Sequence, residues 1–217
     1  IMHGIVTFDD VIRIMQDLAS EDIFTMVGTA KVDPFAKRTT SKIMARAPWL
    51  FTTFLGGLIS AYVLNLFQTT LSEFVTIVFF IPFVLGLAGN VGIQGSTVIV
   101  RGLATGDIQD DNLFTVVKSE LLVGISNGVI FGLLCGGLVA LIAEQVLESN
   151  PLLGLVVGAG IVLAVGIASV IGSTAPILFL KADIDPAISA GPFVTITNDI
   201  VGITVYLATA SYIYSFV

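Results

Sequence analysis

The run LLGLVVGAGIVLAVGIASVIGSTAPILFL, residues 152–180, contains no charged side chain and decides the fold class of this chain. As an α-helix it would be about 43 Å long, at roughly 1.5 Å per residue, which is more than the roughly 30 Å of hydrocarbon in a bilayer. A transmembrane β-strand needs only about ten residues that alternate between apolar and polar, and this run does not alternate. The sequence therefore predicts a membrane-spanning helix.

Four further long apolar runs occur in the chain, at residues 47–67, 74–100, 121–142 and 186–217, and only the last of them contains a charged residue. The chain is 55% hydrophobic and 12% charged, with a mean hydropathy of +1.01, which is far outside the range of soluble domains. We therefore expect an all-α membrane protein with five transmembrane helices. Membrane lipids are expected partners, and nucleic acid is not.

The basic residues indicate how the chain is oriented. All nine Lys and Arg precede the first run, lie between the second and third runs, or directly precede the fifth. Because short basic loops stay in the cytoplasm, we expect a multi-pass cell-membrane protein with its N terminus inside and its C terminus outside. The two outer loops carry Glu73, Glu144 and Glu148 without a basic residue. These acids either concentrate cations at the outer mouth or are simply tolerated there.

Asp199 is the only charged residue inside any of the five runs, and no Lys or Arg lies in the runs to neutralise it. An ionisable group at membrane depth is costly and typically marks an ion, proton or substrate pathway. Gly191 and Thr195 precede Asp199 at four-residue steps and Gly202 follows three residues later, so all four share roughly one helix face. We expect Asp199 to bind a cation and the other three residues to line its path.

The second run carries a polar face as well. Asn90, Gln94 and Thr97 follow one another at helical spacing and share one side of the predicted helix. They either form hydrogen bonds between helices or line a path for a hydrated cation, and the presence of Asp199 favours the second interpretation. We therefore expect these three residues to line a pore.

The third run carries a stripe of small residues, in which glycine recurs at every fourth position at Gly124, Gly128, Gly132 and Gly136. Small residues at this spacing allow two helix backbones to approach closely in a membrane. We expect this stripe to receive a neighbouring helix.

One carboxylate per chain is a poor match to a divalent cation. A two-fold homodimer that places both copies of Asp199 on a shared axis would compensate the charge. Mg²⁺ keeps its waters and is usually held through few carboxylates, and Mn²⁺ also favours oxygen ligands. The single Cys135 and the single His3 do not form a zinc motif, so zinc is not expected.

Residues 1–46 are more polar than the rest and form a second unit. Residues 4–7 (GIVT) read as a short strand, and Thr7 with Asp10 matches a capping box that opens a helix. A second helix start is expected at residues 20–22 (SED). Pro48 and Trp49 suit the beginning of the first membrane span at the lipid interface.

Three parts of the chain resemble one known family, the MgtE magnesium channels and transporters. They are RAPWL at residues 46–50, PFVLGLAGNVGIQ at residues 82–94 with Thr97 and RGLAT at residues 101–105, and DPA at residues 185–187 with Pro192 and NDIVG at residues 198–202. The resemblance implies a homodimer with five helices per protomer and an ion pore along the dimer axis. It also implies that Asp199 holds hydrated Mg²⁺.

The resemblance divides the chain into three units. Residues 1–29 correspond to the end of a cytosolic CBS domain with the connecting, or plug, helix, residues 30–46 to a linker and juxtamembrane segment, and residues 47–217 to the five-helix pore domain. In the family, cytosolic Mg²⁺ favours closure, which makes the acids of the first unit candidate regulatory ligands. These are Asp10, Glu21 and Asp22, whose alternative role is as solvated or helix-starting acids.

Two positions depart from the family pattern, since Ile93 and Gly191 stand where the family has Asn. The lost amides would have bonded the water shell of the ion, so we expect a weaker preference for Mg²⁺ here. The main alternative function is a proton- or sodium-coupled exchanger of divalent cations such as Mg²⁺, Mn²⁺ or Co²⁺. An intramembrane aspartyl protease needs two facing carboxylates, so no enzyme is expected. A purely structural or scaffolding membrane protein is the third alternative. In that case the substitution Asp199→Ala would fold normally and change no ion flux.

Overall fold

A computed structural model describes residues 6–29, 38–109 and 111–216, with residues 15–20 and 22 described by their backbone alone. Apart from turns and short loops, this part of the chain is helical. Its elements are α1 (Phe8–Met26), α2 (Thr39–Leu66), α3 (Gln68–Glu73), the 3₁₀ helix η1 (Val75–Phe80), α4 (Ile81–Thr105), α5 (Leu113–Val146), α6 (Leu152–Lys181), α7 (Pro186–Ile188), the π-helical segment η2 (Ser189–Phe193) and α8 (Val194–Tyr214).

Five helical segments are long and apolar enough to cross a membrane, which confirms the predicted all-α, five-span fold. They are Thr39–Leu66, Val75–Thr105, Leu113–Val146, Leu152–Lys181 and Pro186–Tyr214. The first begins earlier than expected, so Pro48 and Trp49 lie inside α2 rather than at its start. A proline removes only one backbone hydrogen bond, and the residues before it can continue the helix in the N-terminal direction. The expectation that the helix starts at Pro48 was therefore wrong, while its entry into the bilayer near Trp49 stays a prediction.

Helix α1 begins at the predicted capping box. The backbone N–H and the hydroxyl of Thr7 donate to Oδ2 of Asp10 at 3.0 and 2.7 Å, and the backbone N–H of Asp10 donates to Thr7 Oγ1 at 3.3 Å. These hydrogen bonds hold the pKa of the exposed Asp10 carboxyl below its usual value. The predicted second helix start at residues 20–22 is wrong, because α1 continues through it to Met26. Of the predicted strand, residues 4–5 lie outside the described residues, and Val6 and Thr7 are not in a strand.

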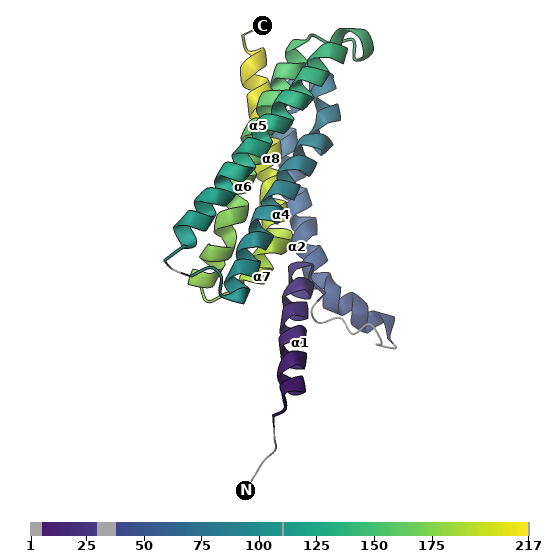
Figure 1. Ribbon diagram of the computed structural model, residues 1–217. Helices are drawn as coiled ribbons and strands as arrows, with labels where there is room; N and C mark the ends of the chain where they lie inside the picture. Colours follow the sequence, from purple (N-terminus) through teal and green to yellow (C-terminus); the bar gives the residue numbers. More distant parts are fainter. Residues whose placement is uncertain (1–5, 30–37, 110, 217) are drawn as a thin grey trace.

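Helix α6 lies at the centre of the bundle and packs against α5, α4 and α8 (Figure 1). Helix α2 packs mainly on α8 and buries only Gly56, so most of its apolar surface faces outward. The helix α1 and the C terminus lie at opposite ends of the bundle, as Figure 1 shows.

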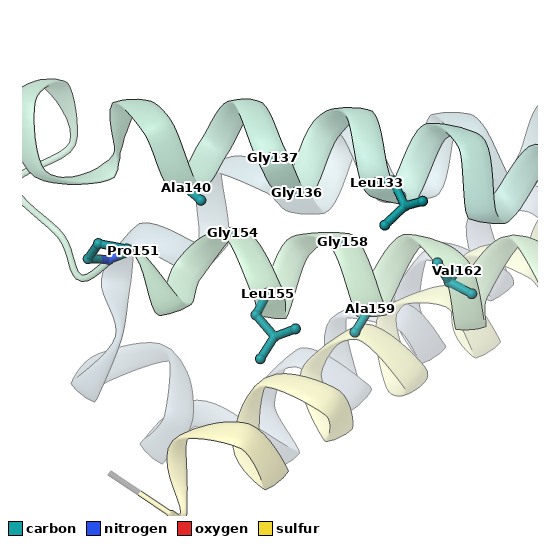
Figure 2. Close-up of a pocket in the computed structure, with 11 residues that line it drawn as sticks. Leu133, Gly136, Gly137, Ala140, Pro151, Gly154, Leu155, Gly158, Ala159 and Val162 are labelled. Carbon is teal, nitrogen blue, oxygen red and sulfur yellow. The ribbon is translucent and has the colours of Figure 1, made fainter.

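The glycine stripe of α5 packs against α6, as predicted. Figure 2 shows Gly136 of α5 across from Gly154 and Gly158 of α6, beside an apolar groove of about 490 Å³. A Cβ atom added at Gly136 would lie 2.6 Å from the carbonyl oxygen of Gly154 and 2.9 Å from Cα of Gly158. Backbone therefore meets backbone here, which is how small residues hold membrane helices together.

A buried tyrosine joins the last span to the segment before α4. The hydroxyl of Tyr206, which is fully buried, donates to the backbone carbonyl of Ile77 at 2.9 Å, and its ring lies against Gly160 of α6. This hydrogen bond fixes the position of α8 along its own axis relative to η1.

The substitution Tyr206→Phe is expected to destabilise the bundle by about 1–3 kcal/mol, because the buried carbonyl of Ile77 loses that donor. Thermal unfolding in detergent micelles measures the change. Tyr212→Phe is the control, since the side chain of Tyr212 is 68% exposed. Equal melting temperatures for the two variants would contradict the role assigned to this hydrogen bond.

Candidate functional site

Asp199 lies near the start of α8 and is partly buried. Three residues earlier, Ile196 packs against Gly56 of α2, and three residues later, Gly202 packs against Leu85 of α4. Since successive helix residues are about 100° apart, the face of Asp199 lies between these two contacts. Within the described residues, no hydrogen bond or ion pair involves its carboxylate. Among the described residues, the structure thus leaves an uncompensated carboxylate on the side of α8 that lies between its contacts with α2 and with α4.

The helix that carries Asp199 is broken two turns before it. The backbone is non-helical at Gly191, inside η2, and Pro192 follows directly. The hydroxyl of Thr195 donates to the carbonyl of Gly191 at 3.1 Å, so Thr195 binds the broken turn rather than Asp199. Irregular backbone at membrane depth is tolerated where protein or a water-filled cavity satisfies it.

The polar residues of α4 lie at the surface of the protomer rather than in the interior of the bundle. Asn90, Gln94 and Thr97 are exposed in the protomer, while Gly92, which packs against α6 and α8, and Ser96 are buried. Ile93 is exposed as well. One protomer therefore does not bring all the predicted pore residues to one place: Gly202 is buried against Leu85, and the Asn90 and Gln94 side chains lie toward α5.

A second carboxylate, which the sequence analysis missed, lies between α4 and α5. Two adjoining grooves of about 250 Å³ each share Gln94 and Asn127 in their lining, and Glu120 lines one of them. The hydroxyl of Ser169 donates to the backbone carbonyl of Glu120 at 3.2 Å. Glu120 directly precedes the third charge-free run and was counted as lying outside it. The sequence did contain a signal for Glu120, because a spacing of seven residues puts Glu120 and Asn127 on the same face of a helix.

The residue before Asp199 is also unusual. Asn198 is 1% exposed, and neither atom of its amide has a hydrogen-bond partner in the described part of the chain. The amide nitrogen lies against Gly92 of α4, and the hydroxyl of Ser96, one turn further along α4, is likewise buried without a partner. The interior next to Asp199 is therefore polar on two helices.

The candidate regulatory acids lie on α1. Asp10 belongs to the capping box and Glu21 is exposed, while the side chain of Asp22 lies outside the described residues. Among the described residues, no group of three or more His, Cys, Asp or Glu side chains is placed to hold a metal ion. The geometry thus offers Asp199, which directly follows the buried Asn198 in α8, as the candidate cation site.

Comparison with known families identifies the family of the chain. A family model described as "MgtE: Divalent cation transporter" matches residues 81–209, which is more than half of the chain and runs from α4 into α8. The chain belongs to the MgtE family. This is a family of transporters and not of enzymes, in agreement with the expectation from the sequence.

Individual MgtE proteins extend the match to nearly the whole chain. It is 33% identical over 208 residues to "Magnesium transporter MgtE" of Enterococcus faecalis, covering 96% of this chain and 45% of that protein. The proteins of the same name from Bacillus subtilis and Thermus thermophilus are each 32% identical, over 211 and 210 residues. They are matched over 97% and 95% of this chain and over 46% and 45% of their own length. The chain thus spans less than half the length of the MgtE relatives it matches.

The MgtE match includes the polar face of α4, Glu120 and Asp199, whereas α1 and α2 precede the matched residues. The five spans and the family together make this MgtE chain a multi-pass membrane protein.

Proposed function

We propose that this chain is the membrane-spanning part of a magnesium channel or transporter that moves hydrated Mg²⁺. The observation that carries the proposal is Asp199, a partly buried carboxylate within the fifth span that has no compensating cation in the described residues. Such a group is retained in a membrane where it serves ion passage. The names of the relatives, magnesium transporters at 32–33% identity, support Mg²⁺ as the cargo.

The working unit in this proposal is a homodimer with the pore on its axis. Two features support it. First, Asn90, Gln94 and Thr97 are exposed in the protomer, where hydrocarbon would leave them without partners. Second, two copies of Asp199 would together compensate one dication, which a single carboxylate cannot do. A second copy of the chain would satisfy both.

The chemistry of the donors fits a hydrated hard cation. Asp199 supplies a carboxylate, and the face of α4 supplies amide and hydroxyl oxygens that can bond the water shell of an ion. Mn²⁺ prefers the same oxygen donors and is a further candidate cargo.

Orientation and regulation belong to the same proposal. The C-terminal ends of α4 and α6 and the N-terminal end of α5 lie at the end of the bundle nearest α1 (Figure 1), so the basic segments share one side. This supports a cytoplasmic N terminus. We further propose that residues 1–29 are the end of a CBS domain with a plug helix, through which cytosolic Mg²⁺ bound near Asp10, Glu21 and Asp22 closes the pore.

The proposal is tested by Mg²⁺ uptake into proteoliposomes that contain the purified chain. We expect uptake driven by the Mg²⁺ gradient and the membrane voltage alone, with no requirement for a proton or sodium gradient. A coupled exchanger would instead stop when both gradients are collapsed. Uptake no faster than in protein-free liposomes would overturn the transport function itself.

Selectivity can be tested at Ile93, the exposed position where the family has Asn. Ile93→Asn is expected to raise the ratio of Mg²⁺ to Mn²⁺ flux, because a restored amide can bond the water shell of Mg²⁺. Gly191 does not offer the same test, since a side chain there would meet the ring of Trp49. An unchanged flux ratio in Ile93→Asn would show that this position does not set selectivity.

A further inference from the structure

The indole of Trp49 lies between two glycines that belong to two other segments. Gly28 forms the turn after α1 with a φ of +69°, and a Cβ added there would collide with Cγ and Cδ2 of Trp49. Gly191 is the non-helical residue of η2, and a Cβ added there would collide with Cζ2 of the same ring. One side chain of α2 is thus in contact with the end of α1 and with the break in the fifth span.

The end of α1 takes part in the same junction. The carbonyl oxygen of Met26 lies 2.5 Å from the position of a Cβ on Gly191. The side chain of Met26 packs against a small buried cluster formed by Val100, Ala187 and Ala190. Figure 1 shows the C-terminal end of α1 next to α2 and close to α7, in agreement with the contacts of α1 with α7 and η2.

The break at Gly191 in turn sets the position of Asp199. From Val194 the chain is continuous α-helix, so a displacement of the turn at Gly191 moves the whole start of α8. Asp199 lies two turns beyond Gly191, and the hydroxyl of Thr195 links the intervening turn to the carbonyl of Gly191. Both glycines allow the backbone to approach the ring closely, and close-packed contacts of this kind transmit displacement.

We propose that Trp49 is a positioning residue for the Asp199 site: its ring, held between Gly28 and Gly191, couples the position of α1 to the orientation of Asp199. If α1 withdraws, Gly28 leaves the ring and the turn at Gly191 is released. By linkage, cation binding at Asp199 must bias the environment of Trp49, and a change at Trp49 must alter cation binding. The inference builds on the proposed function only in taking Asp199 as the cation site.

The test uses the fact that Trp49 is the single tryptophan of the chain, so its fluorescence reports on the junction directly. Emission of the purified chain in detergent is recorded during titration with Mg²⁺, for the unchanged chain, Asp199→Asn and Phe51→Leu. Phe51→Leu reduces an exposed ring two residues from Trp49 and serves as the matched control. We expect Mg²⁺ to shift the emission of the unchanged chain and of the control, and not that of Asp199→Asn.

A second readout measures the effect of Trp49 on cation binding. Bound Mn²⁺ is followed by electron paramagnetic resonance, and the Mn²⁺ concentration at half-saturation is determined. Trp49→Phe is expected to change this concentration about fivefold or more, and Phe51→Leu less than about twofold. If Trp49→Phe does not fold, Trp49→Tyr is measured by the same criterion. An emission that is indifferent to Mg²⁺, or a half-saturating concentration that is unchanged by the substitution, would overturn the coupling. Absent Mg²⁺ flux with a responsive emission would instead refute transport and leave the junction intact.

Discussion

Asp199→Asn is expected to reduce Mg²⁺ flux through reconstituted protein roughly tenfold or more. The amide keeps the shape of the side chain and removes the negative charge that offsets the dication at membrane depth. A tenfold loss corresponds to only about 1.4 kcal/mol, which is small beside the electrostatic cost of an uncompensated cation in a bilayer. The measurement is the initial rate of Mg²⁺ uptake into proteoliposomes at matched protein content.

Asp183→Asn provides the matched control for this prediction. Asp183 is exposed in the loop between α6 and α7 and has a φ of +56°, a conformation that asparagine also tolerates. Asp183→Asn removes one acidic charge from the same chain without changing α8. We expect the Mg²⁺ uptake rate of this variant to stay within about twofold of that of the unchanged protein. Equal losses in both variants would show that the effect of Asp199 is not local.

Gly136→Leu is expected to disrupt the bundle, because the leucine side chain would clash with the backbone of α6. The nearest atoms to an added Cβ are the carbonyl oxygen of Gly154 at 2.6 Å and Cα of Gly158 at 2.9 Å, and backbone cannot rotate away as a side chain can. We expect a destabilisation of about 3 kcal/mol or more, at or above the upper end of the usual range for overpacking. Thermal unfolding in detergent micelles, followed by circular dichroism, measures it.

The neighbouring glycine gives the control. Gly137 is the next residue along α5 and is exposed beside the same groove, but a Cβ there has no heavy atom within 4 Å. Gly137→Leu is expected to leave the melting temperature unchanged or to raise it, since leucine favours helix over glycine by roughly 0.5–1 kcal/mol. A similar loss of stability in both variants would mean that the contact between α5 and α6 is not the cause.

Much of the fold could be predicted from the sequence, because length and apolarity alone identify membrane helices. The five spans, the capping box at Thr7 and the packing role of the Gly136 stripe all rest on local patterns that the structure confirms. The beginning of α2 was misplaced because proline at a helix start and proline in a helix interior look alike in the sequence. The helix start expected at residues 20–22 was wrong for a similar reason, since acidic residues suit both a first turn and an exposed helix face.

The site was predictable only in part. Asp199 stood out by its charge, and the polar face of α4 by its spacing. Which helices these residues face depends on packing that no local pattern specifies. Glu120 was missed because the boundary of a charge-free run fell beside it, and the contact of Trp49 with Gly28 and Gly191 joins residues far apart in the chain. The role of Asp199 in ion passage remains a prediction.

The most direct test of Asp199 as the cation site is the number of ions bound at equilibrium. Bound Mn²⁺ is counted by electron paramagnetic resonance on the purified chain and on Asp199→Asn, with the oligomeric state of each determined by light scattering. The account predicts one ion per dimer of the unchanged chain that is absent from Asp199→Asn. The same number of bound ions in both proteins would contradict it, because the site would then lie elsewhere.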